Sequence, residues 1–215
     1  MNRKIAALIS FFSLIFVVSH SAVRSALVIG INDYPENSEF KDLSNCVAEA
    51  QLIAATLRDV NFKVIEKLNV NQSELDFALE EFENEIQPGG TALVYFAGHG
   101  IEHEGHNYLM TSNALLKAKS RLNEEAVKVD EIAASMLVGG ASSSFLLLDC
   151  CREHPGAGWA SRGRRRTGLA KISADGDLII STAASPGAVA YDGKKGNTPS
   201  DHEREKWMQT GKGKG

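Results

Sequence analysis

The sequence predicts an α/β domain whose central sheet is mostly parallel. Short apolar runs suited to strands alternate with segments whose apolar residues recur every three or four positions, as in helices. Two of the runs, TALVYF and SFLLLD, contain consecutive apolar residues. Strands of that kind are usually covered on both faces, as they are in parallel sheets that lie between helices.

The first half of the domain contains two predicted strands and two predicted helices. The strands are ALVIGI at residues 26–31 and FKVIEKL at residues 62–68, and helical apolar spacing between them predicts a helix over residues 43–60. Asn71 and Glu74 have the spacing of a capping box, in which each side chain accepts a hydrogen bond from a backbone amide at the start of a helix. The motif PGG ends this second helix.

The second half contains four further predicted strands and one helix. The strands lie at residues 91–96, 107–110, 144–149 and 177–182, and the helix lies at residues 129–138. The order of strands and helices again favours a parallel sheet.

One domain accounts for the length and composition of the chain. We expect it at residues 25–199, with a long basic loop at residues 152–176 and an atypical polar tail at residues 200–215. The hydrophobic content of 43% and charged content of 23% are ordinary for a soluble globular protein. Nucleic-acid-binding domains usually carry an excess of basic residues, and this chain has a net charge of −4. We therefore expect no nucleic-acid partner.

Residues 1–22 have the sequence pattern of a secretory signal peptide. The basic start MNRK precedes the apolar run IAALISFFSLIFVV and the small, polar segment SHSA. The run is shorter than the about 20 residues of a membrane-spanning helix. Cleavage near Ser21 or Ala22 would release a secreted or periplasmic protein, and the alternative is an uncleaved segment that anchors the protein in a membrane.

Three cysteines, Cys46, Cys150 and Cys151, are too few for a disulfide framework and could all be small core residues. Two of them directly follow an apolar strand, and His99 lies between glycines at the end of another. A thiol nucleophile needs a base, and the carboxyl ends of parallel strands meet at one sheet edge. If the strand stays extended, Asp149 and Cys151 project from one face, whereas Cys150 points into the fold.

Five segments occur in the order found in caspase-like peptidases: IGINDY, LSNCVAEAQLIAATL, YFAGHG, FLLLDCCR and STAASPGAVAYDG. Over residues 26–199 the chain resembles caspase-like cysteine peptidases of clan CD, peptidase family C14, of the bacterial metacaspase and paracaspase type. The resemblance implies a caspase-like three-layer α/β/α sandwich with a mostly parallel central sheet. Family members usually continue with a helix and a strand where this chain has SDHEREKWMQTGKGKG, so we expect that last helix and strand to be missing.

The resemblance implies a cysteine-type endopeptidase whose catalytic residues are His99 and Cys151. It also implies an oxyanion hole formed by the backbone amides of Gly100 and Cys151, because preorganised amides stabilise the charge of a tetrahedral intermediate. Glycine at positions 98 and 100 would let a substrate approach the backbone closely. We expect no cofactor and no metal, since the histidines of GHGIEHEGH lack the spacing of a zinc motif.

The resemblance also implies a substrate-binding pocket for a basic residue. Asp149 and Glu49 would bind Arg or Lys before the cut bond, because two carboxylates in one pocket favour a cation. The family more often has Asp where Glu49 stands, which leaves the preference between Arg and Lys open. Asp33 and Asp192 are further candidates for substrate binding, and turn formation is the alternative for both.

The expected partners are polypeptide substrates with a basic residue before the cut bond, and a second copy of the chain. Autoprocessing could occur in SRGRRRTG, for which the alternative is a solvated, charged loop. The edge strand at residues 177–182 could pair with its copy in a homodimer. The candidate autoprocessing residues are Arg162, Arg164, Arg165 and Arg166.

The competing function is a non-catalytic caspase-like interaction domain, which the altered C-terminus favours.

Overall fold

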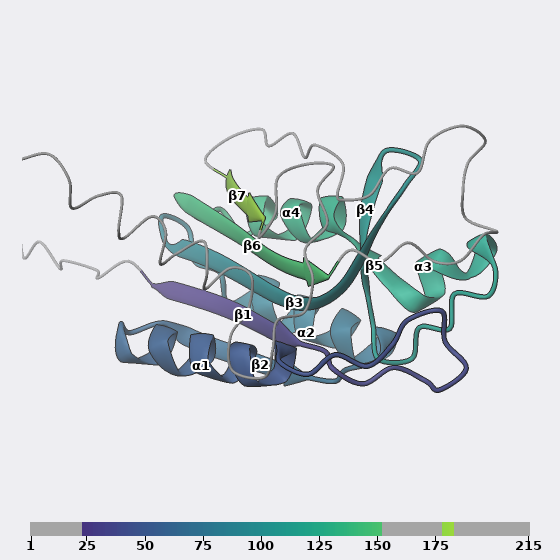
Figure 1. The fold of residues 1–215 in the computed structure, drawn as a ribbon. Helices are drawn as coiled ribbons and strands as arrows, with labels where there is room; N and C mark the ends of the chain where they lie inside the picture. Colours follow the sequence, from purple (N-terminus) through teal and green to yellow (C-terminus); the bar gives the residue numbers. More distant parts are fainter. Residues whose placement is uncertain (1–22, 152–177, 183–215) are drawn as a thin grey trace, which may run out of the picture.

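The computed structural model describes residues 23–151 and 178–182 of the chain (Figure 1). The predicted signal peptide and polar tail, and the predicted loop at residues 152–176, lie outside the described residues. The elements, in chain order, are β1 (Arg24–Gly30), α1 (Cys46–Asp59), β2 (Lys63–Leu68), α2 (Gln72–Glu85), β3 (Thr91–His103), β4 (His106–Met110), the 3-10 helix η1 (Lys119–Arg121), α3 (Leu122–Glu125), β5 (Ala126–Lys128), α4 (Val129–Val138), β6 (Ser143–Cys151) and β7 (Leu178–Thr182).

The described strands form one sheet, most of which is parallel, as predicted. In the order β2, β1, β3, β6, β7, each strand is parallel to its neighbour. The far end of β3 pairs antiparallel with β4, which in turn pairs antiparallel with β5. Within the described residues, β7 pairs only with β6, so it forms the opposite edge of the sheet from β2 (Figure 1).

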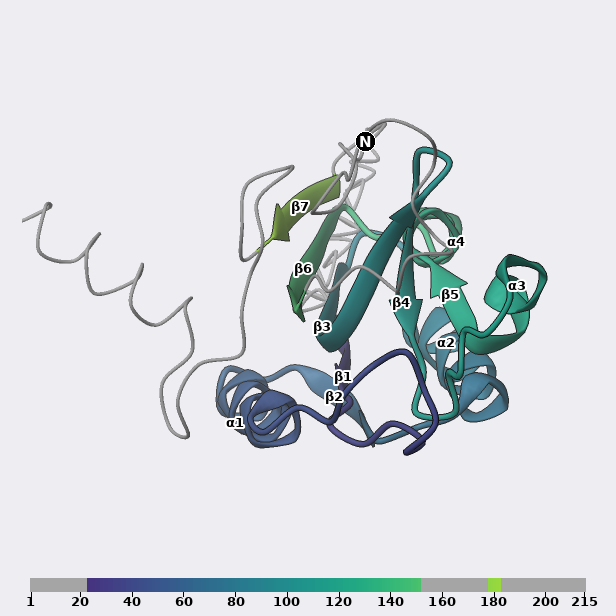
Figure 2. The same ribbon diagram turned by 45° about the vertical axis from the view of Figure 1, so that its right-hand side comes forward.

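Helices cover both faces of the sheet. Buried residues of α1 pack in one core cluster, and buried residues of α2 and α4 pack in a second, larger cluster on the other face. Figure 2 shows α1 on one side of the sheet and α2 and α4 on the other. This arrangement confirms the predicted α/β fold class. Among the described residues, no helix is both long and apolar enough to cross a membrane.

The local signals in the sequence predicted most element positions. The capping box of α2 is present, with Glu74 N donating to Asn71 Oδ1 over 3.0 Å and Asn71 N donating to Glu74 Oε2 over 2.8 Å. The predicted helix at residues 129–138 coincides with α4. The helix predicted to begin at residue 43 begins at Cys46 instead, because the Leu43 amide donates to the carbonyl of Asn32 and stays in the preceding segment.

Two strands are longer than predicted. β3 continues from residue 96 to His103, because the residues after Gly98 pair with β4. β6 continues to Cys151, because its last residues pair with β3. The short elements η1, α3 and β5 were not predicted, since three or four residues are too few to show a period.

Candidate active site

His99 lies in β3 at the point where this strand leaves the parallel sheet. The side chain is fully buried, and its Nε2 atom lies 2.8 Å from the carbonyl oxygen of Lys41. A carbonyl can only accept a hydrogen bond, so Nε2 donates. In the neutral ring this assignment leaves Nδ1 as the acceptor nitrogen. The Lys41 carbonyl therefore selects the tautomer in which Nδ1 can take up a proton.

Two aromatic side chains from the segment between β1 and α1 hold the His99 ring. The Tyr34 ring meets it edge-on at a centroid distance of 4.8 Å, and the Phe40 ring stacks on it at 4.9 Å. The Tyr34 hydroxyl also accepts a hydrogen bond from the His99 backbone amide over 3.0 Å. The imidazole is thus fixed by rings and by hydrogen bonds, as a positioned base must be.

The glycines on either side of His99 make close approaches to protein groups. A Cβ atom at Gly98 would lie 2.9 Å from the Phe96 ring and 3.2 Å from the Tyr34 hydroxyl. A Cβ atom at Gly100 would lie 3.1 Å from Cβ and 3.2 Å from Sγ of Cys150. Both glycines are therefore packed tightly against protein side chains, and the approach of a substrate to them stays a prediction.

The register of β3 and β6 brings the candidate residues together. His99 pairs with Cys151, and Ala97 pairs with Asp149. Neighbouring strands lie about 4.8 Å apart, so paired positions are adjacent in space. β6 remains extended through Cys151, which is the condition on which the predicted alternation of faces depended.

Cys150 lies in the core of the fold. The Cys150 side chain is 1% exposed and belongs to the core cluster that packs against α2 and α4. His99 and Asp149 lie at alternate positions on the opposite face of the sheet. Cys46 is also buried, in the cluster under α1. These positions agree with the expectation that Cys150 points into the fold.

Asp149 and Glu49 come from different elements and act on the same tyrosine. Both are half-buried, Glu49 on α1 and Asp149 on β6. Burial, followed by the negative charges of Asp149 and Glu49, raises the pKa of the buried Tyr95. Since Coulombic effects on a pKa need nearby charges, the two carboxylates converge on this part of β3. Both acids are therefore near enough to Tyr95 to oppose its ionisation.

The remaining candidate residues are less closely connected with this site. The exposed Asp33 accepts a hydrogen bond over 2.5 Å from the side-chain amide of Asn69, which follows β2. β2 lies on the far side of β1 from β3. This contact joins Asp33 to a segment 36 residues further along the chain, so it is not the local turn hydrogen bond considered for Asp33. Asp192 and the candidate autoprocessing arginines lie outside the described residues.

The histidines that follow His99 make pairwise contacts. His103 Nε2 lies 3.6 Å from a carboxylate oxygen of Glu104, and His106 Nδ1 lies 2.7 Å from Asp130 Oδ2. Over residues 23–151 and 178–182, no group of three or more His, Cys, Asp or Glu side chains is arranged to hold a metal ion.

Sequence reasoning did not identify the residues that hold His99. Tyr34 belongs to the IGINDY segment that carries the family resemblance, and no motif includes Phe40 or Lys41. The apolar residues of their segment have no helix or strand period. Every residue has a backbone carbonyl, so the identity of Lys41 gives no sign that its carbonyl binds His99. Tyr95 has the sequence signal of a strand residue alone, because the shift of its pKa depends on two acids from other elements.

Known proteins resemble this chain in both sequence and fold. A family model for the caspase domain matches residues 23–200. Mucosa-associated lymphoid tissue lymphoma translocation protein 1 of Homo sapiens, and its homolog from Mus musculus, are each 30% identical over 130 residues. That match covers 60% of this chain and 15% of each relative, so the chain spans a small part of their length.

The crystal structure of protein GSU0716 from Geobacter sulfurreducens has a similar fold. Its TM-score is 0.60 at 15% identity, and the match covers 89% of this chain and 84% of the other. At this identity the match concerns the fold alone. The match of the caspase-domain model over most of the chain agrees with the resemblance of its motifs and with the α/β/α arrangement. This chain belongs to the caspase-domain family, peptidase family C14.

Proposed function

We propose that this protein is a cysteine endopeptidase that cleaves after Arg or Lys by a dyad of His99 and Cys151. The observation that carries the proposal is the register of β3 and β6, which pairs these two positions at the end of the parallel sheet. Family membership supports a protease-type function. The buried and firmly held His99 supports a role as base.

The proposed reaction follows from this arrangement. His99 Nδ1 takes the proton of the Cys151 thiol, and the thiolate attacks the carbonyl carbon of the cut bond. The backbone amides of Gly100 and Cys151 stabilise the negative oxygen of the tetrahedral intermediate. Protonated His99 then gives its proton to the leaving amine, and water hydrolyses the acyl-enzyme. The Lys41 carbonyl stabilises the imidazolium by accepting from Nε2 throughout.

The proposed specificity rests on Asp149 and Glu49. Their combined negative charge near Tyr95 favours a cation in the pocket, and an Arg side chain can form bidentate hydrogen bonds with a carboxylate. A Lys side chain offers a point charge without that geometry. Asp33 and Asp192 remain proposed contributors at the pocket, although the contact of Asp33 with Asn69 favours a structural role for it.

An activity assay tests the dyad. Wild type, Cys151→Ala and Cys150→Ala would be compared on fluorogenic peptides that end in Arg, Lys or Asp before the dye. We expect hydrolysis after Arg and Lys by wild type and Cys150→Ala, and none by Cys151→Ala. Activity that survives in Cys151→Ala but is lost in Cys150→Ala would show that the nucleophile is wrongly assigned. A properly folded wild type without activity would favour the non-catalytic interaction domain.

We also propose that the enzyme cleaves its own basic loop. The motivating observation is a run of basic residues, SRGRRRTG, in a protein proposed to cut after such residues. Mass spectrometry of the purified chain should find cleavage after Arg162, Arg164, Arg165 or Arg166. The cut should be absent from Cys151→Ala. An intact chain that hydrolyses Arg peptides would eliminate autoprocessing and leave the peptidase proposal standing.

Export and dimerisation complete the proposal. The basic start and apolar run of residues 1–22 motivate export as a secreted or periplasmic protein, and N-terminal sequencing should find cleavage near Ser21 or Ala22. Among the described residues β7 is an edge strand, and its Ile179 is 58% exposed, which motivates a homodimer through this strand. Ile179→Lys should then shift the molecular mass in solution from dimer to monomer. A wild type that is monomeric would contradict this part of the proposal.

A further inference from the structure

The contacts that hold His99 come from a segment without regular structure. Residues 31–45 connect β1 with α1, and they supply the Phe40 ring and the Lys41 carbonyl to the imidazole. Internal hydrogen bonds hold the two ends of this segment, with Tyr34 N donating to Asp42 Oδ1 over 2.8 Å and Leu43 N donating to the carbonyl of Asn32 over 2.8 Å. The middle of the segment, directly before Lys41, also needs contacts with the rest of the protein. Whatever holds the middle of this segment therefore also holds the position and tautomer of His99.

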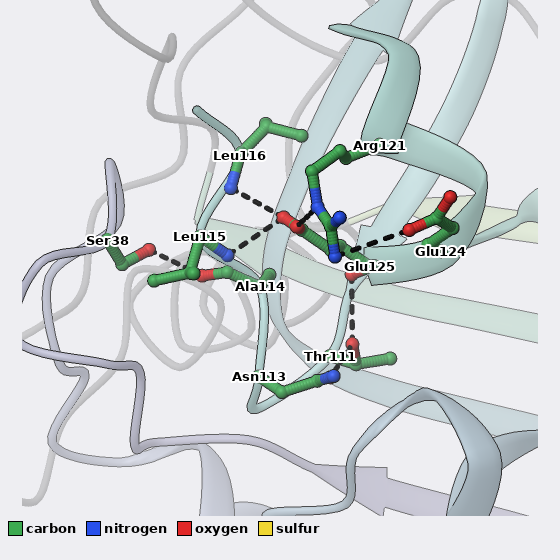
Figure 3. Close-up of polar contacts among 9 residues, drawn as sticks. All are labelled: Ser38, Thr111, Asn113, Ala114, Leu115, Leu116, Arg121, Glu124 and Glu125. Atoms are coloured by element: carbon green, nitrogen blue, oxygen red, sulfur yellow. Dashed lines mark hydrogen bonds and ion pairs between the residues drawn. The ribbon is translucent and has the colours of Figure 1, made fainter. Parts of the chain in front are cut away.

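The middle of this segment is bound to the loop that follows β4. Ser38 Oγ donates to the carbonyl of Ala114 over 2.6 Å, and the Glu39 amide donates to the carbonyl of Leu115 over 3.2 Å. Ser38 Oγ also accepts from the Phe40 amide over 3.0 Å, directly before Lys41. Figure 3 shows Ser38 reaching this loop from the neighbouring segment.

Backbone hydrogen bonds hold the start of the loop after β4, such as that of the Ser112 amide to the carbonyl of Val70, and one buried carboxylate holds its far part. Glu125 is 2% exposed, and its Oε2 atom accepts from the amides of Leu115 over 2.9 Å and Leu116 over 2.6 Å. Its Oε1 atom accepts from Arg121 Nε over 2.6 Å (Figure 3). Leu116 has a φ of 48°, a left-handed conformation that a leucine rarely adopts. The two bonds to Glu125 compensate for that conformation.

We propose that Glu125 is a positioning residue for His99. It acts through the loop of Leu115 and Leu116, then through Ser38, and finally through the Phe40 ring and the Lys41 carbonyl. The inference rests on the proposed function, because it treats His99 as the base of the reaction. Small displacements of a positioned base reduce the rate of the chemical step more than they reduce substrate binding.

Glu125→Gln tests the inference at its origin. Gln has the same shape but offers only one accepting oxygen, so it cannot bind both loop amides and Arg121 together. We expect kcat to fall by about 10- to 100-fold, with KM changed by less than about threefold. The matched control is Glu124→Gln, since Glu124 is exposed and contacts the same Arg121 at 3.2 Å. This control should leave kcat unchanged.

Ser38→Ala tests the next link without changing a buried charge. It removes the bond to Ala114 and should lower kcat in the same direction as Glu125→Gln. The matched control is Ser142→Ala, because Ser142 Oγ likewise donates to backbone carbonyls, those of Gly89 and Gly90 at 3.0 Å. If Glu125→Gln does not fold, the comparison of Ser38→Ala with Ser142→Ala decides the question.

Nitrogen NMR of the His99 ring separates this inference from the proposed function. In wild type, the chemical shift of Nε2 should be that of a protonated ring nitrogen, and the chemical shift of Nδ1 that of an unprotonated one. In Glu125→Gln and Ser38→Ala the two chemical shifts should move toward each other, because the two tautomers then exchange. A folded Glu125→Gln variant with wild-type ring signals and wild-type kcat would overturn the inference. If wild type hydrolyses no peptide, the proposed function fails, and the ring signals alone then decide whether Glu125 positions His99.

Discussion

The two faces of the β3–β6 pair differ in what they bury. The face toward α2 and α4 is a continuous apolar core that includes Phe96, Leu146 and Cys150, all essentially inaccessible to solvent. The face toward α1 has a smaller core and carries the polar side chains of Tyr95 and Asp149. One sheet therefore combines a stabilising face with a face that holds polar groups at low exposure.

This difference explains how neighbouring residues acquire different roles. A strand turns successive side chains to opposite faces, so Cys150 joins the core while Asp149 joins the polar face. Burying polar groups costs stability. The apolar contacts of the other face offset that cost, which is why a site can form in the middle of a sheet.

His99→Gln should abolish the proposed activity while the fold persists. Loss of a general base in a catalytic dyad lowers kcat by about 10⁴-fold or more. Steady-state kinetics on an Arg peptide would measure the loss, and circular dichroism would monitor the fold. The control is His106→Gln, which removes a surface contact with Asp130. Equal losses in both variants would show that the polar face has no special role.

Phe96→Ala should be the most destabilising single change that leaves the polar face intact. Phe96 is fully buried in the larger core, and its removal should lower the free energy of unfolding by about 3–5 kcal/mol. Phe145→Ala, on the α1 face and only partly buried, should cost about 1–2 kcal/mol. Urea denaturation measures both values. Equal costs would mean that the two faces contribute equally to stability.

Asp149→Asn should weaken substrate recognition more than it affects folding. Loss of a charged hydrogen-bonding partner for Arg should lower kcat/KM on Arg peptides by about 10- to 100-fold. Glu49→Gln should have a similar effect, and the double variant should lose less than the product of the two, because both acids act on one ligand. Asp130→Asn is the surface control. Unchanged kcat/KM in Asp149→Asn would remove this residue from the pocket.

Tyr95 should make the folded protein sensitive to alkaline pH. Because its pKa is raised in the folded state, Tyr95 keeps its proton where the unfolded chain has lost it. Its contribution to stability is therefore present below about pH 10 and falls by about 1.4 kcal/mol per pH unit above that value. Urea denaturation from pH 9 to 11 should show this loss in wild type. A Tyr95→Phe variant with the same pH dependence would contradict the prediction.

Much of the fold could be predicted because its signals are local. The capping box at Asn71 and Glu74 depends on residues three positions apart, and the apolar period of α4 lies within ten residues. The extension of β3 to His103 could not be predicted, because it depends on pairing with β4. Strand ends are set by partners, whereas helix starts are often set by the nearest side chains.

The candidate site could be predicted only in part. Family resemblance selected His99 and Cys151, and strand alternation separated Cys150 from its neighbour. The roles of Lys41 and Glu125 could not be predicted, because a backbone carbonyl has no sequence signature and a buried acid looks like any other glutamate. The contact of Lys41 with His99 joins residues 58 positions apart in the chain, and the contact of Glu125 with Leu116 joins a helix with a preceding loop nine positions away.

The sequence by itself determined the α/β fold class, the family and the residue types available for catalysis. These properties depend on composition, period and short motifs, which are local. Only the tertiary structure decided which groups surround His99, which face Cys150 occupies and which acids act on Tyr95. The physical reason is that strand register and loop contacts bring distant residues together, and their energies depend on that three-dimensional arrangement.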